Sequence, residues 1–334
     1  MKSLKINGKL AMAITDEEVP EPQAGQVRIK VAFVGVCGSD LHYYFEGANG
    51  AFVVREPLIP GHELSGTVDA DPSGELQPGT RVAIHPARFG TRLSEISDRP
   101  HLWPRGSYLG SASTNPHTQG AMTEYMIVER SMIRVLPASI SLKGAALAEP
   151  LAVGIHAINI AGGVEGKKVL VSGSGPIGLL AAAAAKLLGA ASVTASDVLD
   201  GPLHRAHGVG AHATVKVTET PLPVEEFDVV LECSGVPRAI SAALNAVRRA
   251  GVVVQVGMLP AGDQPIALAS LVSKEVQLRG TFRFNNEIDD AIALLANNPS
   301  LEQVITHTFS IDDAIAGFEM AKNSELSGKV LIEL

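Results

Sequence analysis

The chain has 334 residues, of which 46% are hydrophobic and 19% are charged, and its 27 lysines and arginines against 35 aspartates and glutamates give a formal net charge of −8. This composition excludes a disordered, collagen-like or disulfide-stapled small protein, and the length is sufficient for two domains that each bury a core. An acidic chain without a basic run is not expected to bind nucleic acid, so the expected partners are small molecules.

The part of the chain up to about residue 150 consists of short predicted strands separated by glycine and proline. These strands cover residues 27–34, 64–68, 81–84 and 122–128. The polar segment 88–108 has no clear periodicity and is expected to be a solvated loop. This part is therefore predicted to be a β-rich domain.

From about residue 167, apolar runs alternate with alanine-rich helical stretches. The predicted strands cover residues 169–171, 192–195, 227–231, 252–256 and 276–278. Continuous apolar strands separated by helices indicate a parallel sheet covered on both faces. Two helix-like segments, 287–296 and 311–322, and a strand at 330–334 follow, and we expect them to return to the first domain.

A glycine-rich turn joins the first of these strands to a helix. Gly173, Gly175 and Gly178 have the spacing of the dinucleotide-binding turn, in which the glycines permit a tight bend, close approach of a pyrophosphate and close helix packing. Asp197 follows at the end of the next strand, where a carboxylate binds the adenosine ribose hydroxyls and repels a 2′-phosphate. The sequence thus predicts NAD rather than NADP.

A second group of residues has the chemistry of metal ligands. Cys37 follows a predicted strand, the pair His62 and Glu63 precedes another, and Glu149 begins a helical run. Taken singly, each is more simply a core or surface residue. Together with the dinucleotide motif, a thiolate, an imidazole and a carboxylate favour a catalytic zinc site.

Ordered motifs along almost the whole chain resemble the zinc-dependent medium-chain dehydrogenase/reductase family, and within it the polyol dehydrogenase branch. The motifs lie at residues 37–44, 61–63, 147–156, 173–178, 232–235, 254–258 and 278–284. The resemblance implies an α/β protein with a β-rich GroES-like catalytic domain, residues 1–150 and 285–334, and a doubly wound Rossmann domain with a parallel sheet, residues 151–284, with the active-site cleft between them.

The resemblance also implies roles for single residues. Cys37 and His62 would bind zinc directly. Glu63 and Glu149 would be the carboxylates near the zinc, and one of these two would act only through water. Asp40 would orient His62.

The same resemblance implies a proton path and the binding pockets. Ser39 would take the proton of the substrate hydroxyl and pass it, through the nicotinamide ribose, to His42, with Glu149 as a further catalytic residue. Tyr43 and Arg283 would contact the substrate. The expected cofactor-binding residues are Gly173, Gly175, Pro176, Ile177, Gly178, Asp197, Cys233, Ser234, Val256 and Gly257.

One departure from the family concerns a second, structural zinc. Family members that bind it carry four closely spaced cysteines in the region of residues 88–108, which has no cysteine here. We therefore expect one catalytic zinc per chain and no structural zinc. The region around 276–278 pairs subunits in the family, which implies a homodimer or homotetramer.

The predicted activity is zinc-dependent hydride transfer between NAD and a secondary alcohol of a polyol or aldonate. The most specific expectation is oxidation of L-idonate to 5-keto-D-gluconate; the alternatives are a sorbitol, xylitol or threonine substrate, or a non-catalytic NAD-binding sensor. The chain has two cysteines and no signal-peptide or membrane-spanning segment, so we expect a cytoplasmic protein without a membrane partner.

Overall fold

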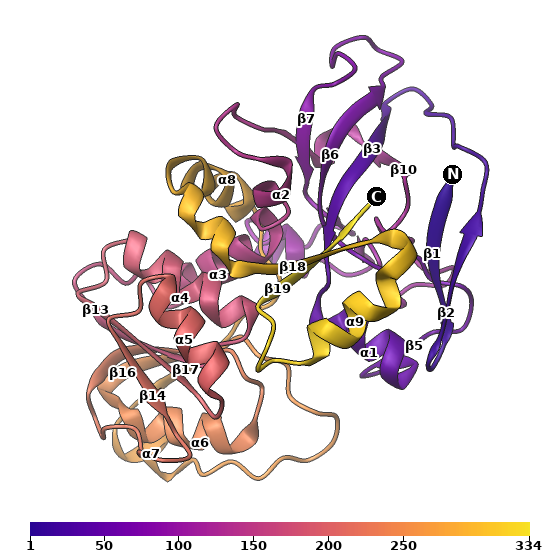
Figure 1. The fold of residues 1–334 in the computed structure, drawn as a ribbon. Helices are drawn as coiled ribbons and strands as arrows, with labels where there is room; N and C mark the ends of the chain where they lie inside the picture. The colour runs from indigo at the N-terminus through magenta and orange to yellow at the C-terminus, as the bar shows by residue number, and fades with distance from the viewer. The chain divides into compact units, whose positions relative to one another are not determined.

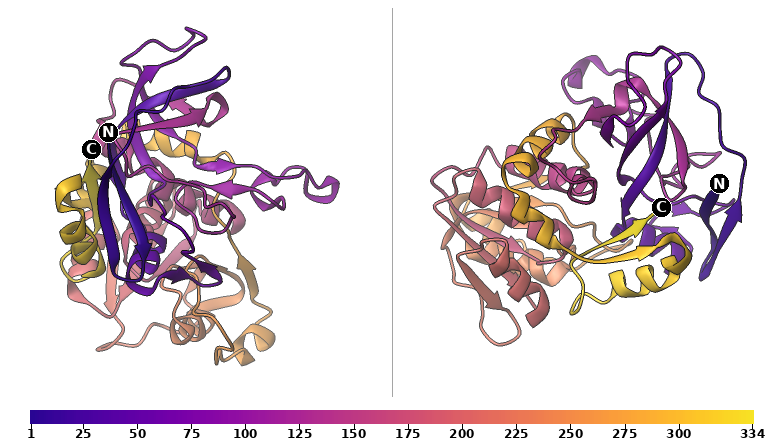
Figure 2. Two further views of the ribbon diagram at one scale, coloured as in Figure 1. Left: turned by 90° about the vertical axis from the view of Figure 1, so that its right-hand side faces the viewer. Right: turned by 45° about the horizontal axis from the view of Figure 1, so that its top comes forward.

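The computed structural model describes residues 1–334, which divide into two compact units (Figures 1 and 2). Unit 1 contains Met1–Glu149, Leu295–Asn323 and Lys329–Leu334, and unit 2 contains Pro150–Leu294 and Ser324–Gly328. The chain passes between the units at four points: within α3 (Ala148–Ile160), within α8 (Glu287–Asn297), and on either side of Ser324–Gly328. The boundary in α8 falls near the end of this helix, whereas it was predicted in front of it, at residue 284.

Unit 1 is built on a mixed seven-stranded sheet. In sheet order its strands are β11 (Ile133–Val135), β7 (Arg81–Ile84), β6 (Glu63–Ala70), β3 (Gln26–Gly35), β19 (Lys329–Glu333) and β18 (Ile305–Ser310), and β10 (Tyr125–Glu129) also pairs with β3. Apolar side chains of β3, among them Val27, Ile29 and Val34, are buried in the core of the unit. Because β19 pairs with β3, segments far apart in the sequence complete one sheet.

The remaining elements of unit 1 surround this sheet. They are β1 (Lys2–Gly8) and β2 (Ala11–Asp16), α1 (Gly38–Glu46), β4 (Ala48–Asn49), β5 (Phe52–Val53), β8 (Ala87–Arg88), β9 (Ser107–Tyr108), α2 (Leu142–Ala145), α9 (Ala314–Lys322), and the 3-10 helices η1 (Ser94–Ile96), η2 (Pro100–Leu102), η3 (Arg130–Met132), η4 (Pro299–Val304) and η5 (Ile311–Asp313). The segment 86–108 reaches out from the body of its unit as a long arm (Figure 2) and exposes Phe89, Leu93 and Leu102.

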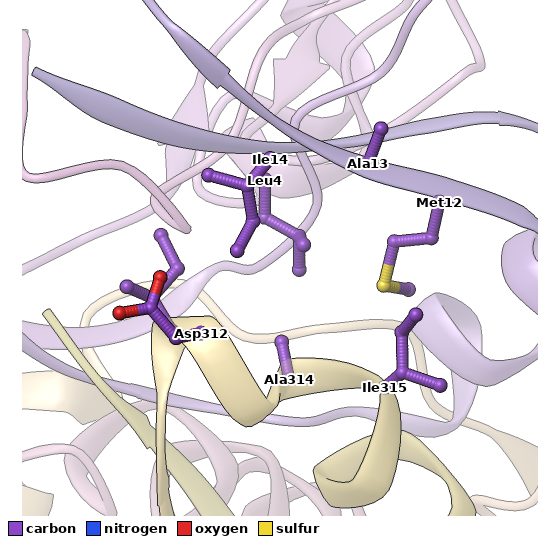
Figure 3. A pocket seen from close by; sticks show the side chains of 8 residues that line it. Leu4, Met12, Ala13, Ile14, Asp312, Ala314 and Ile315 are labelled. Atoms are coloured by element: carbon purple, nitrogen blue, oxygen red, sulfur yellow. The ribbon is translucent and has the colours of Figure 1, made fainter.

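A small apolar hollow of about 130 Å³ lies between the β1–β2 hairpin and the segment leading into α9 (Figure 3). Its lining consists of Leu4, Met12, Ala13, Ile14, Ile311, Asp312, Ala314 and Ile315. The only charged residue among them, Asp312, pairs with Lys2 at 2.7 Å. The hollow therefore offers no group for chemistry.

Unit 2 contains a six-stranded sheet in which all neighbouring strands are parallel, as the apolar runs predicted. In sheet order the strands are β14 (Ala213–Lys216), β13 (Ser192–Asp197), β12 (Lys168–Ser172), β15 (Phe227–Glu232), β16 (Val247–Gln255) and β17 (Gln277–Gly280). Counted along the chain from β12, this is the order 3-2-1-4-5-6 of the Rossmann fold, which binds dinucleotides beyond the carboxyl ends of its strands.

Helices connect the strands of unit 2. Besides α3 and α8 they are α4 (Pro176–Leu187), α5 (Asp200–Gly208), α6 (Pro237–Ala246) and α7 (Ala269–Ser273). The middle of α4 consists of buried alanines and leucines, which lets it pack closely on β12 and β13. No helix in the structure is both long and apolar enough to cross a membrane.

An ion pair joins α3 and α8 within unit 2. Glu287 Oε1 lies 2.8 Å from His156 Nδ1 and accepts a hydrogen bond from Asn159, while Oε2 accepts one from the N–H of Asn285. Burial raises the pKa of Glu287, but these hydrogen bonds outweigh burial and lower the pKa to about 2. Since the pKa in the folded protein lies below the usual value of 4.5, ionised Glu287 stabilises the fold above that pH and stops doing so as the pH falls through 2.

We expect Glu287→Gln to lower the free energy of unfolding by about 1–3 kcal/mol at pH 7, because a buried charge-assisted contact is lost. The difference in the free energy of unfolding between the variant and the unchanged protein should become smaller as the pH falls from 4.5 toward 2. Urea unfolding at pH 7 and at pH 3 measures this difference. Glu226→Gln, which removes a solvent-exposed ion pair with Lys168, is the control and should change the free energy of unfolding by less than about 1 kcal/mol. An equal loss of stability in both variants, or a loss in Glu287→Gln that does not depend on pH, would contradict the prediction.

Candidate functional site

Three of the predicted metal ligands lie together in unit 1. Cys37 caps the N-terminus of α1 just beyond β3, and His62 and Glu63 lead into β6, the neighbour of β3. The register of the two strands places Gly35 opposite Glu63, so the end of one strand meets the start of the other. Ligand atoms of Cys37, His62 and Glu63 all lie within 4.8 Å of one another.

Asp40 fixes the two segments that carry these residues. Its Oδ2 accepts a hydrogen bond from the N–H of Cys37 at 3.0 Å, and its Oδ1 accepts one from the N–H of Gly61 at 3.0 Å. Asp40 is predicted to orient the ring of His62. Its hydrogen bonds go to the backbone, because it lies in the first turn of α1, where a carboxylate caps the helix N-terminus. Its charge also acts on His62, whose pKa it raises.

His62 is buried, and its Nδ1 has no hydrogen-bond partner. A buried polar atom without a partner calls for a ligand, and a ring nitrogen is a common metal ligand. Burial lowers the pKa of His62, but the charge and hydrogen bond of Cys37 outweigh burial and raise the pKa to about 10. The surroundings of His62 thus favour a positive charge, and a thiolate, an imidazole and a carboxylate suit zinc. The residues present fit a zinc ion.

Glu63 is paired with a lysine that the sequence analysis did not single out. Lys329 Nζ lies 2.7 Å from Glu63 Oε1 and 2.6 Å from Oε2, and the two side chains are 2% and 0% exposed. Burial lowers the pKa of Lys329, but the charge of Glu63 outweighs burial and raises it, so the lysine is charged. Gly35 makes room for the carboxylate, because a Cβ there would lie 2.0 Å from Oε2. Lys329 begins β19, directly before the buried apolar residues 330–332.

Glu149, the other predicted carboxylate, begins α3 and is also buried. Its Oε1 accepts a hydrogen bond from the Tyr108 hydroxyl at 2.5 Å. Burial raises the pKa of Glu149, and the charge of His62 opposes this rise. The Tyr108 ring makes an edge contact with the ring of His62, with centroids 5.4 Å apart. Tyr108, which the sequence analysis missed, thus joins Glu149 to the cluster.

Three further residues predicted for catalysis or substrate binding, Ser39, His42 and Tyr43, lie on α1. Ser39 is half-buried in its first turn, and His42 is exposed, with its Nδ1 3.2 Å from Glu46 one helical turn further on. Tyr43 is buried, and its hydroxyl accepts a hydrogen bond from the N–H of Ala112. The hydroxyl of Tyr43 is thus engaged within unit 1.

The glycine-rich turn of unit 2 follows β12 and leads into α4. Gly173 has a φ of +90°, which side chains rarely adopt, and a Cβ on Gly178 would lie 1.9 Å from the Gly173 carbonyl oxygen. Gly175 caps α4, with Pro176 and Ile177 in the first turn, and nothing lies within 4 Å of where its Cβ would be. The open space in front of a helix N-terminus is where a pyrophosphate binds.

Asp197 ends β13, the strand next to β12. Its Oδ2 accepts a hydrogen bond from the N–H of Ser174, and its Oδ1 accepts two from Val198 and Leu199, all between 2.7 and 3.1 Å. The carboxylate is therefore held at the glycine turn.

A second turn, at the end of β15, carries Cys233 and Ser234. The buried carboxylate of Glu232 accepts hydrogen bonds from the N–H groups of Ser234 and Gly235 at 3.0 Å. The N–H groups of Val256 and Gly257 in turn bind the carbonyl of Glu232, and a Cβ on Gly257 would lie 2.2 Å from the nitrogen of Gly235. The predicted cofactor-lining residues of β15 and β16 thus form one packed edge. Burial raises the pKa of the Cys233 thiol.

Arg283, predicted to meet the substrate, follows β17. Its φ is +53°, and its guanidinium lies 4.7 Å from the centre of the Phe282 ring.

Comparison with known proteins adds sequence matches in both halves of the chain. The alcohol dehydrogenase GroES-like domain matches residues 23–138, and the zinc-binding dehydrogenase domain matches residues 176–297. L-idonate 5-dehydrogenase (NAD(P)(+)) of Escherichia coli K12 is 38% identical over 302 residues, which cover 89% of this chain and 88% of that protein. Sorbitol dehydrogenase of Gallus gallus is 36% identical over 329 residues, which cover 94% and 91%.

Solved structures match over the full length. The structure of L-idonate 5-dehydrogenase from Escherichia coli superposes with a TM-score of 0.94 at 33% identity, covering 100% of this chain and 98% of that one. Galactitol-1-phosphate dehydrogenase from Escherichia coli gives 0.89 at 30% identity, with 100% of both chains covered. These matches confirm the predicted fold class, a GroES-like domain with a Rossmann domain.

Proposed function

Because the chain belongs to the zinc-binding dehydrogenase family, in its polyol dehydrogenase branch, and is an oxidoreductase, we propose that it transfers a hydride between NAD and a secondary alcohol of a polyol or aldonate. The oxidation of L-idonate to 5-keto-D-gluconate is the specific reaction proposed. The observation that carries the proposal is the cluster of half-buried Cys37 with buried His62 and Glu63, with an unpartnered imidazole nitrogen, in a chain that also carries the dinucleotide turn.

Cys37 and His62 would hold the zinc, together with Glu63 or Glu149. Zinc at this cluster supplies a Lewis acid that makes the proton of an alcohol easier to remove at neutral pH. The chain's own residues position the ligands: Asp40 holds the two ligand segments together through their backbone N–H groups, and His62 and Glu63 are buried.

The proton leaves by way of α1. Ser39 takes it from the substrate hydroxyl, and His42, which is exposed, passes it to water. Since Glu46 lies at Nδ1 of His42, Nε2 is the nitrogen left for the transfer.

The groups near Asp197 favour NAD over NADP. A carboxylate held in place by three backbone N–H groups can accept hydrogen bonds from the ribose hydroxyls of NAD and repels the 2′-phosphate of NADP. Arg205, the nearest cation along the chain, donates to the carbonyl oxygens of Ser324 and Glu325. It is therefore already engaged and not arranged for a 2′-phosphate.

A substrate panel tests the proposal directly. Purified protein is assayed with L-idonate, sorbitol, xylitol and threonine, each with NAD and with NADP. We expect the highest kcat/KM for L-idonate with NAD, at least about tenfold above that with NADP, because Asp197 repels the extra phosphate. Asp197→Ser should narrow this ratio, and an unchanged ratio would remove Asp197 from cofactor selection.

Two other outcomes of the panel are informative. Preferential turnover of sorbitol would select the alternative that the similarity to sorbitol dehydrogenase supports. Binding of NADH without turnover of any substrate would replace the enzyme by an NAD-binding sensor.

The strand β17 supports a homodimer or homotetramer. It lies at the edge of the unit 2 sheet, paired on one side with β16, and it exposes Leu278. An edge strand with free backbone groups is a template for pairing with a second chain. We further propose one zinc per chain, since the arm formed by residues 86–108 has no cysteine.

A further inference from the structure

Lys329 is the buried charged group of unit 1 for which the proposed mechanism has no use. It is 2% exposed, its Nζ contacts both oxygens of Glu63, and its one further partner is the carbonyl oxygen of Val36 at 3.2 Å. A lysine is almost never buried without a purpose, because removing an ammonium from water costs several kcal/mol.

Glu63 therefore has two possible cationic partners. One is Lys329, seen in the structure, and the other is the zinc that the cluster fits. Glu63 Oε2 lies 2.6 Å from Nζ without receiving a well-directed hydrogen bond, so this oxygen keeps a lone pair for a metal. Gly35 leaves the space that this oxygen occupies, because a Cβ there would lie 2.0 Å from Oε2.

We propose that Lys329 is the internal counter-ion that holds Glu63 when zinc is not bound, and that zinc must share this carboxylate with it. This inference rests on the proposed zinc site. In the zinc-free protein, Lys329 neutralises a fully buried carboxylate; in the zinc-bound protein, the metal supplies that neutralisation as well. Removing the ammonium therefore destabilises the zinc-free protein more than the zinc-bound protein. By thermodynamic linkage, the variant without the ammonium then binds zinc more tightly.

The proposal predicts that removing a residue next to the metal site strengthens zinc binding, and this direction of the change makes it testable. Truncating a residue that merely supports a metal site weakens metal binding. Lys329→Met, which keeps the length of the side chain and removes the charge, should instead strengthen it. We expect its zinc Kd to fall about tenfold, and we expect zinc to raise the melting temperature more than it does in the unchanged protein.

The measurement uses full-length protein freed of metal with a chelator and verified to be metal-free. The zinc Kd is obtained by competition with a chromophoric chelator, and thermal unfolding is followed with and without zinc. Lys329→Arg keeps the charge and should retain a Kd close to that of the unchanged protein. Glu63→Gln removes the shared carboxylate and should weaken zinc binding, also in combination with Lys329→Met.

Lys274→Met is the matched control. Lys274 is a second buried lysine, 6% exposed, but it lies in unit 2 and donates only to the carbonyl oxygens of Asn245 and Val247. Its replacement should lower the melting temperature equally with and without zinc and leave the zinc Kd unchanged.

The outcomes separate the inference from the proposed function. If the unchanged protein binds zinc but Lys329→Met binds it equally or more weakly, the counter-ion role is overturned and the zinc site stands. If the unchanged protein binds no zinc, the proposed function fails, and the inference with it. If Lys329→Met folds only with metal, its refolding yield is measured against zinc concentration: rescue by zinc and not by magnesium supports the inference, and no rescue overturns it.

Discussion

Replacing Cys37 with serine is expected to lower kcat by more than about 100-fold, and to lower zinc affinity with it, while NADH binds as before. Serine keeps the shape of the side chain but does not supply a thiolate, the soft ligand of the cluster. The dinucleotide turn lies in unit 2 and is not altered. Steady-state kinetics, zinc content by elemental analysis and NADH fluorescence titration measure the three effects.

The other cysteine provides the control for zinc content. Cys233→Ser changes a half-buried cysteine of unit 2 and should leave one zinc per chain. Near-normal turnover and zinc content in Cys37→Ser would remove Cys37 from the metal site.

Two glycines of the dinucleotide turn should respond to alanine in opposite ways. A Cβ on Gly178 would lie 1.9 Å from the backbone oxygen of Gly173, so Gly178→Ala must move either the turn or α4. We expect it to lower the free energy of unfolding by about 1–3 kcal/mol. A Cβ on Gly175 meets no protein atom within 4 Å, so Gly175→Ala should change stability by less than about 0.5 kcal/mol.

The added methyl group of Gly175→Ala instead occupies the space through which a pyrophosphate approaches the helix N-terminus. We expect the Kd for NADH to rise at least about tenfold. Urea unfolding and NADH titration of both variants distinguish a packing glycine from a ligand-binding glycine. Unchanged NADH binding by Gly175→Ala would place the pyrophosphate elsewhere.

The inner strands of the unit 2 sheet could be predicted from the sequence because they are largely buried. Their apolar runs led to β12, β13, β15 and β16, and the edge strand β17 was also predicted, although its residues are exposed or half-buried. The edge strand β14 was missed, since its residues are exposed or half-buried and show no such run. In unit 1, β18 was missed for the same reason, because only its first residue is buried.

For the candidate site, the sequence identified residues by chemical type but not their partners. The chemistry of Cys37, His62 and Glu63, together with the dinucleotide turn, suggested metal ligands, and these three do lie together. The backbone partners of Asp40, the N–H groups of Cys37 and Gly61, were not predicted, because they depend on how α1 and the segment before β6 lie together. Lys329 was not singled out, because its pairing with Glu63 depends on which strands lie side by side in the sheet, which no local pattern reveals.

The pairing of Glu63 with Lys329 also has a consequence for biosynthesis. The two residues are 266 positions apart, and residues 150–294 of unit 2 lie between them in the chain. While the ribosome makes that unit, β3 lacks its neighbour β19 and Glu63 lacks its ammonium partner. Contacts over such sequence distances form late, because the intervening chain must first be ordered or looped out. The full surroundings of the metal cluster therefore arise only after the dinucleotide-binding unit has been synthesised, although the residues of the cluster itself all lie within the first 63 positions.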